Sequence, residues 1–165
     1  QSLFQGTPMT TPAALDRFDL AILNILQADN TTPQRAIAQA VNLSAPAVQR
    51  RIQRLKEEGV IRGQVTLLDR KKIGLNTQIF AEVKLNAHGR SNFTEFTEAV
   101  RGFPEVLECL LITGQQSDYQ LKVVVGDMDA YQDLLLNKIT RIQGVTGVHT
   151  SFVLRKVVDR TALPV

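Results

Sequence analysis

The sequence predicts an α+β protein in two parts: three short helices, followed by an antiparallel sheet with two helices on one face. Three observations predict this arrangement. Apolar residues recur at helical spacing from about residue 15 to residue 59, they alternate as in strands from about residue 76, and the later segments follow the order βαββαβ. With 165 residues and 44% hydrophobic content, the chain can form two small domains with packed cores.

The first two predicted helices are marked by apolar stripes. Residues 15–28 form the first helix, which Asp29 and Asn30 close. Its stripe consists of Leu15, Phe18, Ile22, Ile25 and Leu26. The second helix is expected to start at Pro33 behind an N-cap at Thr32, because proline lacks the N–H that the first helical position leaves unbonded. It ends near Val41, and Ile37, Ala38 and Val41 face inward.

The third helix follows the second after a tight turn. Asn42 can adopt the left-handed conformation that turns the chain, Ser44 caps the third helix, and Gly59 ends it. Val48, Ile52 and Leu55 share one face of this helix. Three helices of these lengths describe a helix-turn-helix, and the third is then the recognition helix.

The charge of this region indicates its partner. Residues 30–56 contain five basic side chains and no Asp or Glu, although the whole chain has 19 Lys plus Arg against 16 Asp plus Glu. A solvated helix face usually carries both acidic and basic side chains. A helix with one apolar face and an opposite face of Arg and Gln is therefore better suited to the major groove of double-stranded DNA. The predicted DNA contacts are Arg35, Ser44, Ala45, Pro46, Ala47, Gln49, Arg50, Arg51 and Arg54. Of these, Arg51 and Arg54 are expected to contact mainly phosphate.

The ends of this first domain are set by composition. Residues 1–8 contain the run LFQG, which resembles an affinity-tag protease site, so Met9 is the expected native start. The DNA-binding domain is predicted to span residues 9–61, and a strand-containing linker residues 62–75. Residues 60–68 alternate weakly and could form a two-stranded wing.

The second domain, residues 76–165, is predicted from a change of period. Residues 77–85 alternate, with Ile79, Ala81, Val83 and Leu85 on one face and Phe80 among polar residues on the other. Three further strands are expected at residues 106–113, 119–125 and 145–157.

Two helices lie between these strands. Ser91 is expected to cap the first, whose stripe is Phe93, Phe96, Val100 and Phe103. Asp127 or Asp129 opens the second, whose stripe is Tyr131, Leu135, Ile139 and Ile142, and Gly144 ends it. The resulting βαββαβ order is the ferredoxin-like arrangement, with both helices on one sheet face. The other face, with Phe80, is left bare, so we expect a two-fold partner to cover it and the chain to form at least a homodimer.

Other classes of protein are disfavoured by what the sequence contains. No apolar run approaches the ~20 residues of a membrane span, so no membrane association is expected. The single Cys109 suits a reducing cytoplasm and is expected to pack in the core. His88 and His149 are the only histidines and are far apart in sequence, so neither a metal site nor catalysis is predicted. RNA binding is a weaker alternative, because the basic helix lacks interleaved aromatic residues.

Long stretches of the chain resemble the Lrp/AsnC (feast/famine) family of transcriptional regulators. In the first domain the matching motifs are LDRFDLAIL and LSAPAVQRRIQRLKEEGVI. In the second they are PEVLECLLITG, DYQLKVVVGDMDAY and GVTGVHTSFVL. The resemblance covers residues 15 to about 164 and is specific, because two long motifs occur in the right order.

The resemblance implies a nucleoid-associated regulator of amino-acid metabolism. It implies dimers joined through the ferredoxin-like domains and assembled into octamers, with a small amino acid bound between dimers. The implied effector-binding residues are Leu111, Gly114, Gln116, Ser117, Asp118, Tyr119, Met128, Ser151 and Val153. No other cofactor is implied. Asp118 would hold the ammonium group of the effector, and backbone amides near Gly114 its carboxylate, because glycine permits close backbone approach.

One departure from the family pattern leaves the effector open. The family usually has Gly-Asp-x-Asp-Tyr here, whereas this chain has Gly114-Gln-Gln-Ser-Asp118-Tyr119, with one extra residue and without the first carboxylate. Leu111, Met128 and Val153 would favour leucine or methionine, while Gln115 and Gln116 would favour a polar amino acid. The alternative function is an architectural DNA-binding protein that needs no effector.

Overall fold

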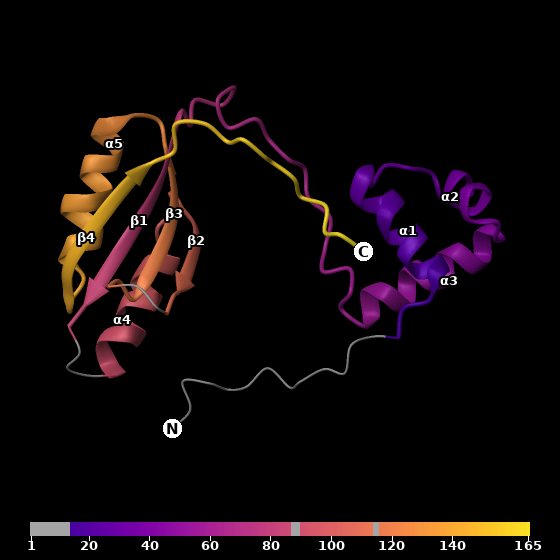
Figure 1. Ribbon diagram of the computed structural model, residues 1–165, viewed down its shortest axis with the longest axis horizontal. Coiled ribbons are helices and arrows are strands. Elements are labelled where there is room, and N and C mark those ends of the chain that lie inside the picture. Colours follow the sequence, from indigo (N-terminus) through magenta and orange to yellow (C-terminus); the bar gives the residue numbers. More distant parts are fainter. Residues whose placement is uncertain (1–13, 87–89, 114–115) are drawn as a thin grey trace. The chain divides into compact units, whose positions relative to one another are not determined.

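The computed structural model describes residues 14–86, 90–113 and 116–165 (Figure 1). The expected tag remnant, Met9, His88, Gly114 and Gln115 lie outside these ranges. The chain forms two compact units. The first contains residues 14–66 together with 158–165, and the second residues 67–157. Among the described residues, no helix is long and apolar enough to cross a membrane.

Helix α1 (Arg17–Ala28) begins two residues later than predicted because a capping box fixes its start. The Asp16 carboxylate accepts hydrogen bonds from the backbone N–H groups of Phe18 and Asp19, at 2.8 and 2.9 Å. The Asp19 carboxylate in turn accepts one from the Asp16 N–H at 3.1 Å. This reciprocal pair satisfies N–H groups that have no partner inside the helix. Asp19 is therefore buried in the first turn.

Helix α2 (Gln34–Val41) starts differently from the prediction. Pro33 is its N-cap, not its first residue, and Thr32 does not cap it. The Thr32 hydroxyl instead donates to the Asp29 carbonyl at 2.8 Å, closing the turn that follows α1. The turn after α2 is as predicted, since Asn42 has left-handed backbone angles (φ 54°, ψ 45°).

Helix α3 (Ala45–Glu57) agrees with the prediction. The Ser44 hydroxyl accepts a hydrogen bond from the Ala47 N–H at 3.3 Å, and Gly59 follows the helix with φ +74°. Val48, Ile52 and Leu55 are buried. The core of this unit brings the three helices together through Ile22, Ile37, Ala38, Val41, Val48 and Ile52.

The predicted wing is not formed, because no strand occurs between residues 60 and 76. Val65, Leu67 and Leu68 are exposed there. A weakly alternating segment becomes a strand only when another strand supplies its hydrogen bonds, and none lies beside this one in the described chain.

The C-terminal tail belongs to the first unit, whereas the prediction placed it with the second domain. The Leu163 N–H donates to Gln27 Oε1 at 2.6 Å, and Gln27 Nε2 donates back to the Leu163 carbonyl at 3.1 Å. Asn24 Nδ2 donates to the Val165 carbonyl at 3.0 Å. Polar side chains on the exposed side of α1 thus bind the backbone of an extended segment.

The second unit is a four-stranded antiparallel sheet in the order β2-β3-β1-β4. Its strands are β1 (Thr77–Leu85), β2 (Val106–Leu111), β3 (Tyr119–Val125) and β4 (Val145–Phe152). This is the predicted ferredoxin-like order. In the central strand Ile79, Ala81, Val83 and Leu85 face the core, as the alternation predicted.

Two predicted strands are shorter in the structure. Strand β2 ends at Leu111 instead of Thr113, and β4 at Phe152 instead of Val157. The last contact of β4 with β1 is the hydrogen bond from the Val153 N–H to the Gln78 carbonyl, at 2.9 Å. Strand β1 begins at Thr77, which lies opposite Leu154 in the register of this pair, so β1 does not extend far enough to pair with the rest of the predicted strand.

Both helical segments of this unit pack on one face of the sheet. Helix α4 (Arg90–Arg101) supplies Phe96 and Val100 to the core. It already includes Ser91, which therefore is not its N-cap. Helix α5 (Met128–Asp133) is capped by Asp127, whose carboxylate accepts from the Ala130 N–H at 2.9 Å.

The end of the α5 region departs from regular α-helix. Residues 134–138 form a π-helical turn and residues 139–141 a 3₁₀ turn. The π-turn lies between Leu134 and Ile139, which are five residues apart and are both buried, as Tyr131 is. The predicted stripe agrees with the structure: Tyr131 and Ile139 are in the core, and Leu135 and Ile142 are partly buried and pack against it. Leu134, which the prediction did not include, is also buried. Gly144 ends the region with φ +91°, and a Cβ at this position would lie 2.8 Å from the Asn92 side chain.

The opposite sheet face carries Phe80, paired across the strands with Lys122 of β3 and Ser151 of β4. Leu110 of β2 lies on the same face and is exposed. Both helical segments lie on the other side of the sheet, so this apolar surface is the bare face that the sequence predicted.

Candidate functional site

The outward surface of α3 is the first candidate site. Ser44, Pro46, Gln49 and Arg50 are exposed, and Ala45 and Ala47 are half-buried. These six residues come from the N-cap and the first half of the helix, so they form one continuous patch. Arg35 of α2 is also exposed. No acidic residue lies in the first turn of α3, so the partial positive charge of the helix N-terminus is not offset there.

The second half of α3 is held by α1 through an ionic cluster that the sequence analysis missed. Arg51 Nη1 donates to Asp16 Oδ2 at 2.7 Å and to Asp19 Oδ1 at 2.8 Å. Arg54 Nη2 donates to Asp19 Oδ2 at 2.6 Å. The Asp19 side chain is only 1% exposed, whereas those of Arg51 and Arg54 are 26% and 40% exposed. A buried carboxylate is thus satisfied by two guanidinium groups of α3.

The protonation of this cluster follows from its contacts. Burial alone would raise the pKa of Asp19, but the hydrogen bonds from Arg54 and Arg51 outweigh burial, and the pKa is lowered from its ordinary value. Hydrogen bonds to the carboxylates raise the pKa of Arg51 and Arg54 in turn. All three groups are therefore charged at neutral pH, and the cluster forms an ion-paired link between α1 and α3.

This arrangement divides the predicted DNA contacts into two sets. Within the described chain Arg35 and Arg50 have no ion-pair partner, whereas Arg51 and Arg54 are occupied. One signal in the sequence could have revealed the cluster. Asp16 and Asp19 are three residues apart, as are Arg51 and Arg54, so each pair lies on one side of its helix.

The second candidate site is the segment that joins β2 to β3. The carboxylate of Asp118 accepts a hydrogen bond from the Leu85 N–H at 2.8 Å and lies 3.7 Å from the Lys84 ammonium group, both through Oδ2. Its backbone N–H donates to the Val83 carbonyl at 2.9 Å. Asp118 therefore anchors the end of β3 to β1. Gln116 is exposed and Ser117 half-buried.

The predicted effector-binding residues do not come together in one chain. Leu111 pairs with Tyr119, beside Asp118, at one end of the sheet. Val153 bonds to Gln78, which pairs with Val124 near the other end of β3. The five residue steps from Tyr119 to Val124 span roughly 17 Å of strand. Met128 follows β3 at this far end, and Ser151 lies between the two ends on the bare face.

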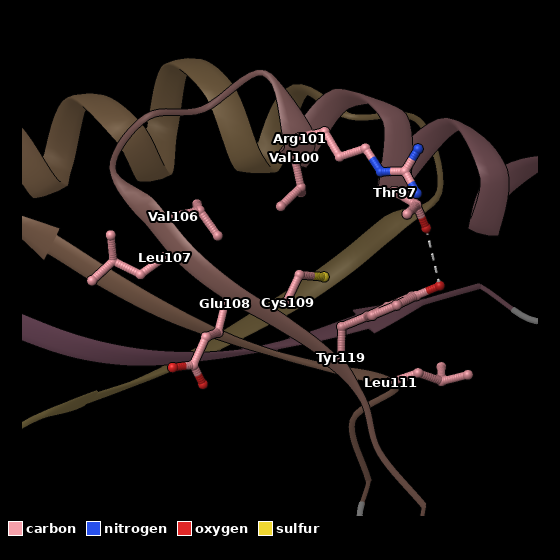
Figure 2. Close-up of a pocket in the computed structure, with 9 residues that line it drawn as sticks. All are labelled: Thr97, Val100, Arg101, Val106, Leu107, Glu108, Cys109, Leu111 and Tyr119. Carbon is pink, nitrogen blue, oxygen red and sulfur yellow. Dashed lines mark hydrogen bonds between the residues drawn. The ribbon is translucent and has the colours of Figure 1, made fainter. Parts of the chain in front are cut away.

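Tyr119 lies mainly in the core. It is 7% exposed, its ring centroid is 4.7 Å from that of Phe96, and its hydroxyl lies 3.4 Å from the Thr97 hydroxyl oxygen. Figure 2 shows the hydroxyls of Tyr119 and Thr97 pointing toward each other from β3 and α4. An effector can thus reach at most the edge of this tyrosine.

A pocket of about 450 Å³ lies between α4 and β2 (Figure 2). Its lining is mainly apolar, and its two charged residues have partners. Arg101 pairs with Glu98 at 2.8 Å, and Glu108 with Lys122 at 2.7 Å. An amino acid needs an anion for its ammonium and donors for its carboxylate, and this pocket lacks such a pair. Of the predicted effector residues, only Leu111 and Tyr119 line it.

Cys109 lies in this pocket and is exposed, so the prediction that it packs in the core was wrong. It sits on the edge strand β2, where no neighbouring strand covers it. The partial burial that remains raises the pKa of the thiol, so the thiol is protonated at neutral pH and is a poor nucleophile. Among the described residues, no group of His, Cys, Asp and Glu could hold a metal ion.

Comparisons with known proteins identify the two domains and the family of this chain. Residues 15–62 match the model of a winged helix-turn-helix DNA-binding domain, and residues 78–163 match that of the Lrp/AsnC ligand binding domain. The chain belongs to the Lrp/AsnC family. The resemblance seen in the sequence is thereby confirmed, as are the α+β fold class and the function of a DNA-binding transcriptional regulator.

Relatives of this Lrp/AsnC protein match it over nearly their whole length. The Bkd operon transcriptional regulator of Pseudomonas aeruginosa is 39% identical over 92% of this chain and 99% of its own. The DNA-binding transcriptional activator DecR of Escherichia coli is 34% identical, with the same coverage. A Neisseria meningitidis transcriptional regulator, solved as a complex with L-methionine, has a TM-score of 0.87 at 31% identity, covering 91% of this chain and 96% of that one.

Proposed function

We propose that this regulator recognises its operator with the first half of α3. The contact residues are Ser44, Ala45, Pro46, Ala47, Gln49 and Arg50, with Arg35 on phosphate. The observation that carries the proposal is the exposed patch at the N-terminal end of α3, with Arg50 unpaired beside it in the described chain. Arg50 and Gln49 can donate to base edges, and the helix N-terminus favours a phosphate. Arg51 and Arg54, which the sequence assigned to phosphate, are proposed to act first on the structure of the domain.

Isolation of bound DNA from cells tests this proposal. Fragments that co-purify with the chain should share a pseudo-palindromic motif, because a two-fold dimer presents two α3 helices. An operator found in this way should be protected from nuclease by the wild-type protein. Recovery of DNA with no shared motif would instead support the architectural alternative.

We further propose that a small amino acid binds where the Asp118 end of one subunit meets the Val153 end of another. The separation of roughly 17 Å within one chain supports a site completed only between subunits. Asp118 would supply an anion for the ammonium group, and both of its internal contacts use Oδ2. Met128 and Val153 would meet an apolar side chain. The Neisseria structure holds L-methionine, which supports an effector of this class.

Mixing subunits tests the composite site. Asp118→Ala damages one end and Val153→Asp the other, so each variant alone should bind no amino acid in calorimetric titration. Co-refolded mixtures should regain part of the wild-type binding, because some sites combine two undamaged ends. A site contained in one chain would show no recovery in the mixture.

One observation favours a second candidate, the effector-independent architectural protein. The Asp118 carboxylate already has the Leu85 N–H and the Lys84 ammonium group as partners, which a regulator without an effector would also have. Titration with each of the twenty amino acids separates the two candidates. With either function, we propose that the protein acts in the cytoplasm, associated with the nucleoid. We propose that it acts as dimers assembled into octamers and catalyses no reaction.

A further inference from the structure

Charge on the recognition helix is partly cancelled inside the first unit. Helix α3 carries Arg50, Arg51, Arg54 and Lys56. Two of these four bond to the carboxylates of Asp16 and Asp19, so the cluster of two arginines and two aspartates has no net charge. Arg50 and Lys56 have no ion-pair partner in the described chain.

We propose that Asp19 determines specificity, because its buried carboxylate withholds Arg51 and Arg54 from DNA phosphate. Attraction to phosphate is independent of sequence and supplies most non-specific binding. With these two guanidinium groups withheld, the protein depends on the first half of α3 for its affinity. This inference rests on the proposal that α3 enters the groove.

The geometry of the cluster explains why the two arginines stay withheld. Asp19 accepts from both of them and from the Asp16 N–H, and its side chain is 1% exposed. If both arginines turned to phosphate, a buried carboxylate would lose its counter-ions, which is strongly unfavourable. Arg51 is the more firmly held, since it bonds to two carboxylates and lies 5.4 Å from the Phe18 ring centroid. Arg54 has one short bond and a looser contact with Glu58 at 3.9 Å.

The salt dependence of binding measures this effect. For B-DNA, the slope of log K against log salt concentration is about −0.9 for each phosphate neutralised. Releasing one or two arginines from each of two α3 helices should therefore steepen the slope by roughly 2 to 4. Affinity for unrelated duplexes should rise at low salt, and the ratio of operator to non-operator affinity should fall.

The test compares Asp19→Asn with Asp29→Asn in the full-length protein. Both substitutions remove one negative charge from the same unit. Asp29 contacts Thr31 and no arginine, so it controls for net charge alone. Binding of an operator and of an unrelated duplex is measured between roughly 50 and 400 mM KCl, a range over which phosphate contacts weaken strongly. Circular dichroism gives the folded fraction under the same conditions. We expect the steeper slope for Asp19→Asn only.

Two results would overturn the inference. An unchanged slope, with affinity for both duplexes reduced in proportion to the folded fraction, would leave Asp19 a purely structural role. Equal changes in the two variants would assign the effect to net charge. If Asp19→Asn does not fold, Asp16→Asn replaces it, because asparagine is an equally good N-cap and Arg51 loses one ionic partner. It should steepen the slope less, and no steepening there would also overturn the inference.

A double variant tests whether the released Arg54 causes the change in salt slope. In the Asp19→Asn protein, adding Arg54→Gln should return about half of the change in slope, while in the wild-type background it should change the slope little. Failure of the proposed recognition surface would look different, since Arg50→Ala would then leave operator binding intact in every background.

Discussion

The two candidate sites differ in how much of each lies within one chain. The α3 surface is complete in a single subunit, because six of the seven residues from Ser44 to Arg50 form it and α1 is ion-paired to the same helix. The predicted effector residues lie at two ends of one sheet, with Asp118 and Val153 separated by most of the length of β3. The first site can therefore be tested with point variants of one chain, while the second is proposed to form only between subunits.

The two units also differ in what their exposed apolar surfaces imply. In the first unit the apolar faces of three helices close on one another around Ile22, Val48 and Ile52. In the second, both helical segments lie on one side of the sheet and leave Phe80 and Leu110 on the other. We therefore expect a partner to cover the second unit and not the first.

Phe80→Asp, on the bare face of the second unit, should have the largest effect, and the quantity it changes is the free energy of dimerisation. A charge at the centre of the bare face would have to be desolvated when a second copy packs there, so we expect dimerisation to weaken by about 3 kcal/mol, or roughly 100-fold or more. Sedimentation over a range of micromolar protein concentrations measures this. Leu136→Asp is the control, because Leu136 is an exposed apolar residue of the helical layer. Equal dissociation of both variants, or of neither, would contradict the assignment of this face.

Asp19 should dominate the response of the first unit to acid. Its pKa lies below the ordinary 3.8, so its charged form stabilises the fold. The contribution is complete above the unfolded-state pKa and is lost as the pH falls through the lowered folded-state value. The charged groups that face it are Arg51, Arg54 and Asp16.

Urea unfolding between about pH 7 and pH 3 checks this expectation. At neutral pH, Asp19→Asn should lower the free energy of unfolding by about 1.5–3 kcal/mol, the range for hydrogen bonds to charged groups. Because the variant cannot gain this proton, its curve should approach that of the wild type at low pH. Parallel pH curves for the two proteins would show that Asp19 is not the group responsible.

Arg50→Ala tests the first half of α3 directly. We expect a loss of about 1–3 kcal/mol in operator binding and a relaxed base preference, because arginine can pair with a guanine edge. Lys56→Ala is the matched control, since Lys56 is an exposed cation at the far end of the same helix. It should reduce the salt slope by at most about 1 per subunit without changing base preference. Identical profiles for the two variants would mean that Arg50 only adds charge.

Features set by neighbouring residues could be predicted from the sequence. The cap at Ser44, the turn at Asn42, the buried face of β1 and the strand order all follow from short-range periodicity and residue chemistry. The lengths of β2 and β4 were overestimated, because a strand ends where its partner ends and the sequence of one strand does not show this. Likewise, the wing at residues 60–68 was expected from alternation that finds no partner in the described chain.

Features that depend on distant residues were missed. The pairing of Asp19 with Arg51 and Arg54 joins residues 32 and 35 positions apart, so charge counted along α3 alone overstated its positive surface. The π-turn at residues 134–138 was also missed, because regular helical spacing does not show where a helix gains one residue in a turn. Where the predicted effector residues lie depends on strand register, which places Leu111 beside Tyr119 and Val153 beside Gln78.

The smallest expected effect concerns the C-terminal tail, where the chain enters the first unit a second time. Gln27→Ala removes both hydrogen bonds to the Leu163 backbone. The bonds are exposed, so the free energy of unfolding should fall by only about 0.5–1 kcal/mol. The sensitive measurement is hydrogen exchange, because the bond to Gln27 protects the Leu163 N–H, which should exchange many times faster in the variant.

Gln39→Ala on α2 is the control, since Gln39 is an exposed helical glutamine whose side chain does not bond to the tail. If Leu163 exchanges at the same rate in Gln27→Ala as in the wild type, the tail is not held by Gln27 of α1. If the rate rises in Gln27→Ala and not in Gln39→Ala, the hydrogen bonds of Gln27 hold the tail against α1.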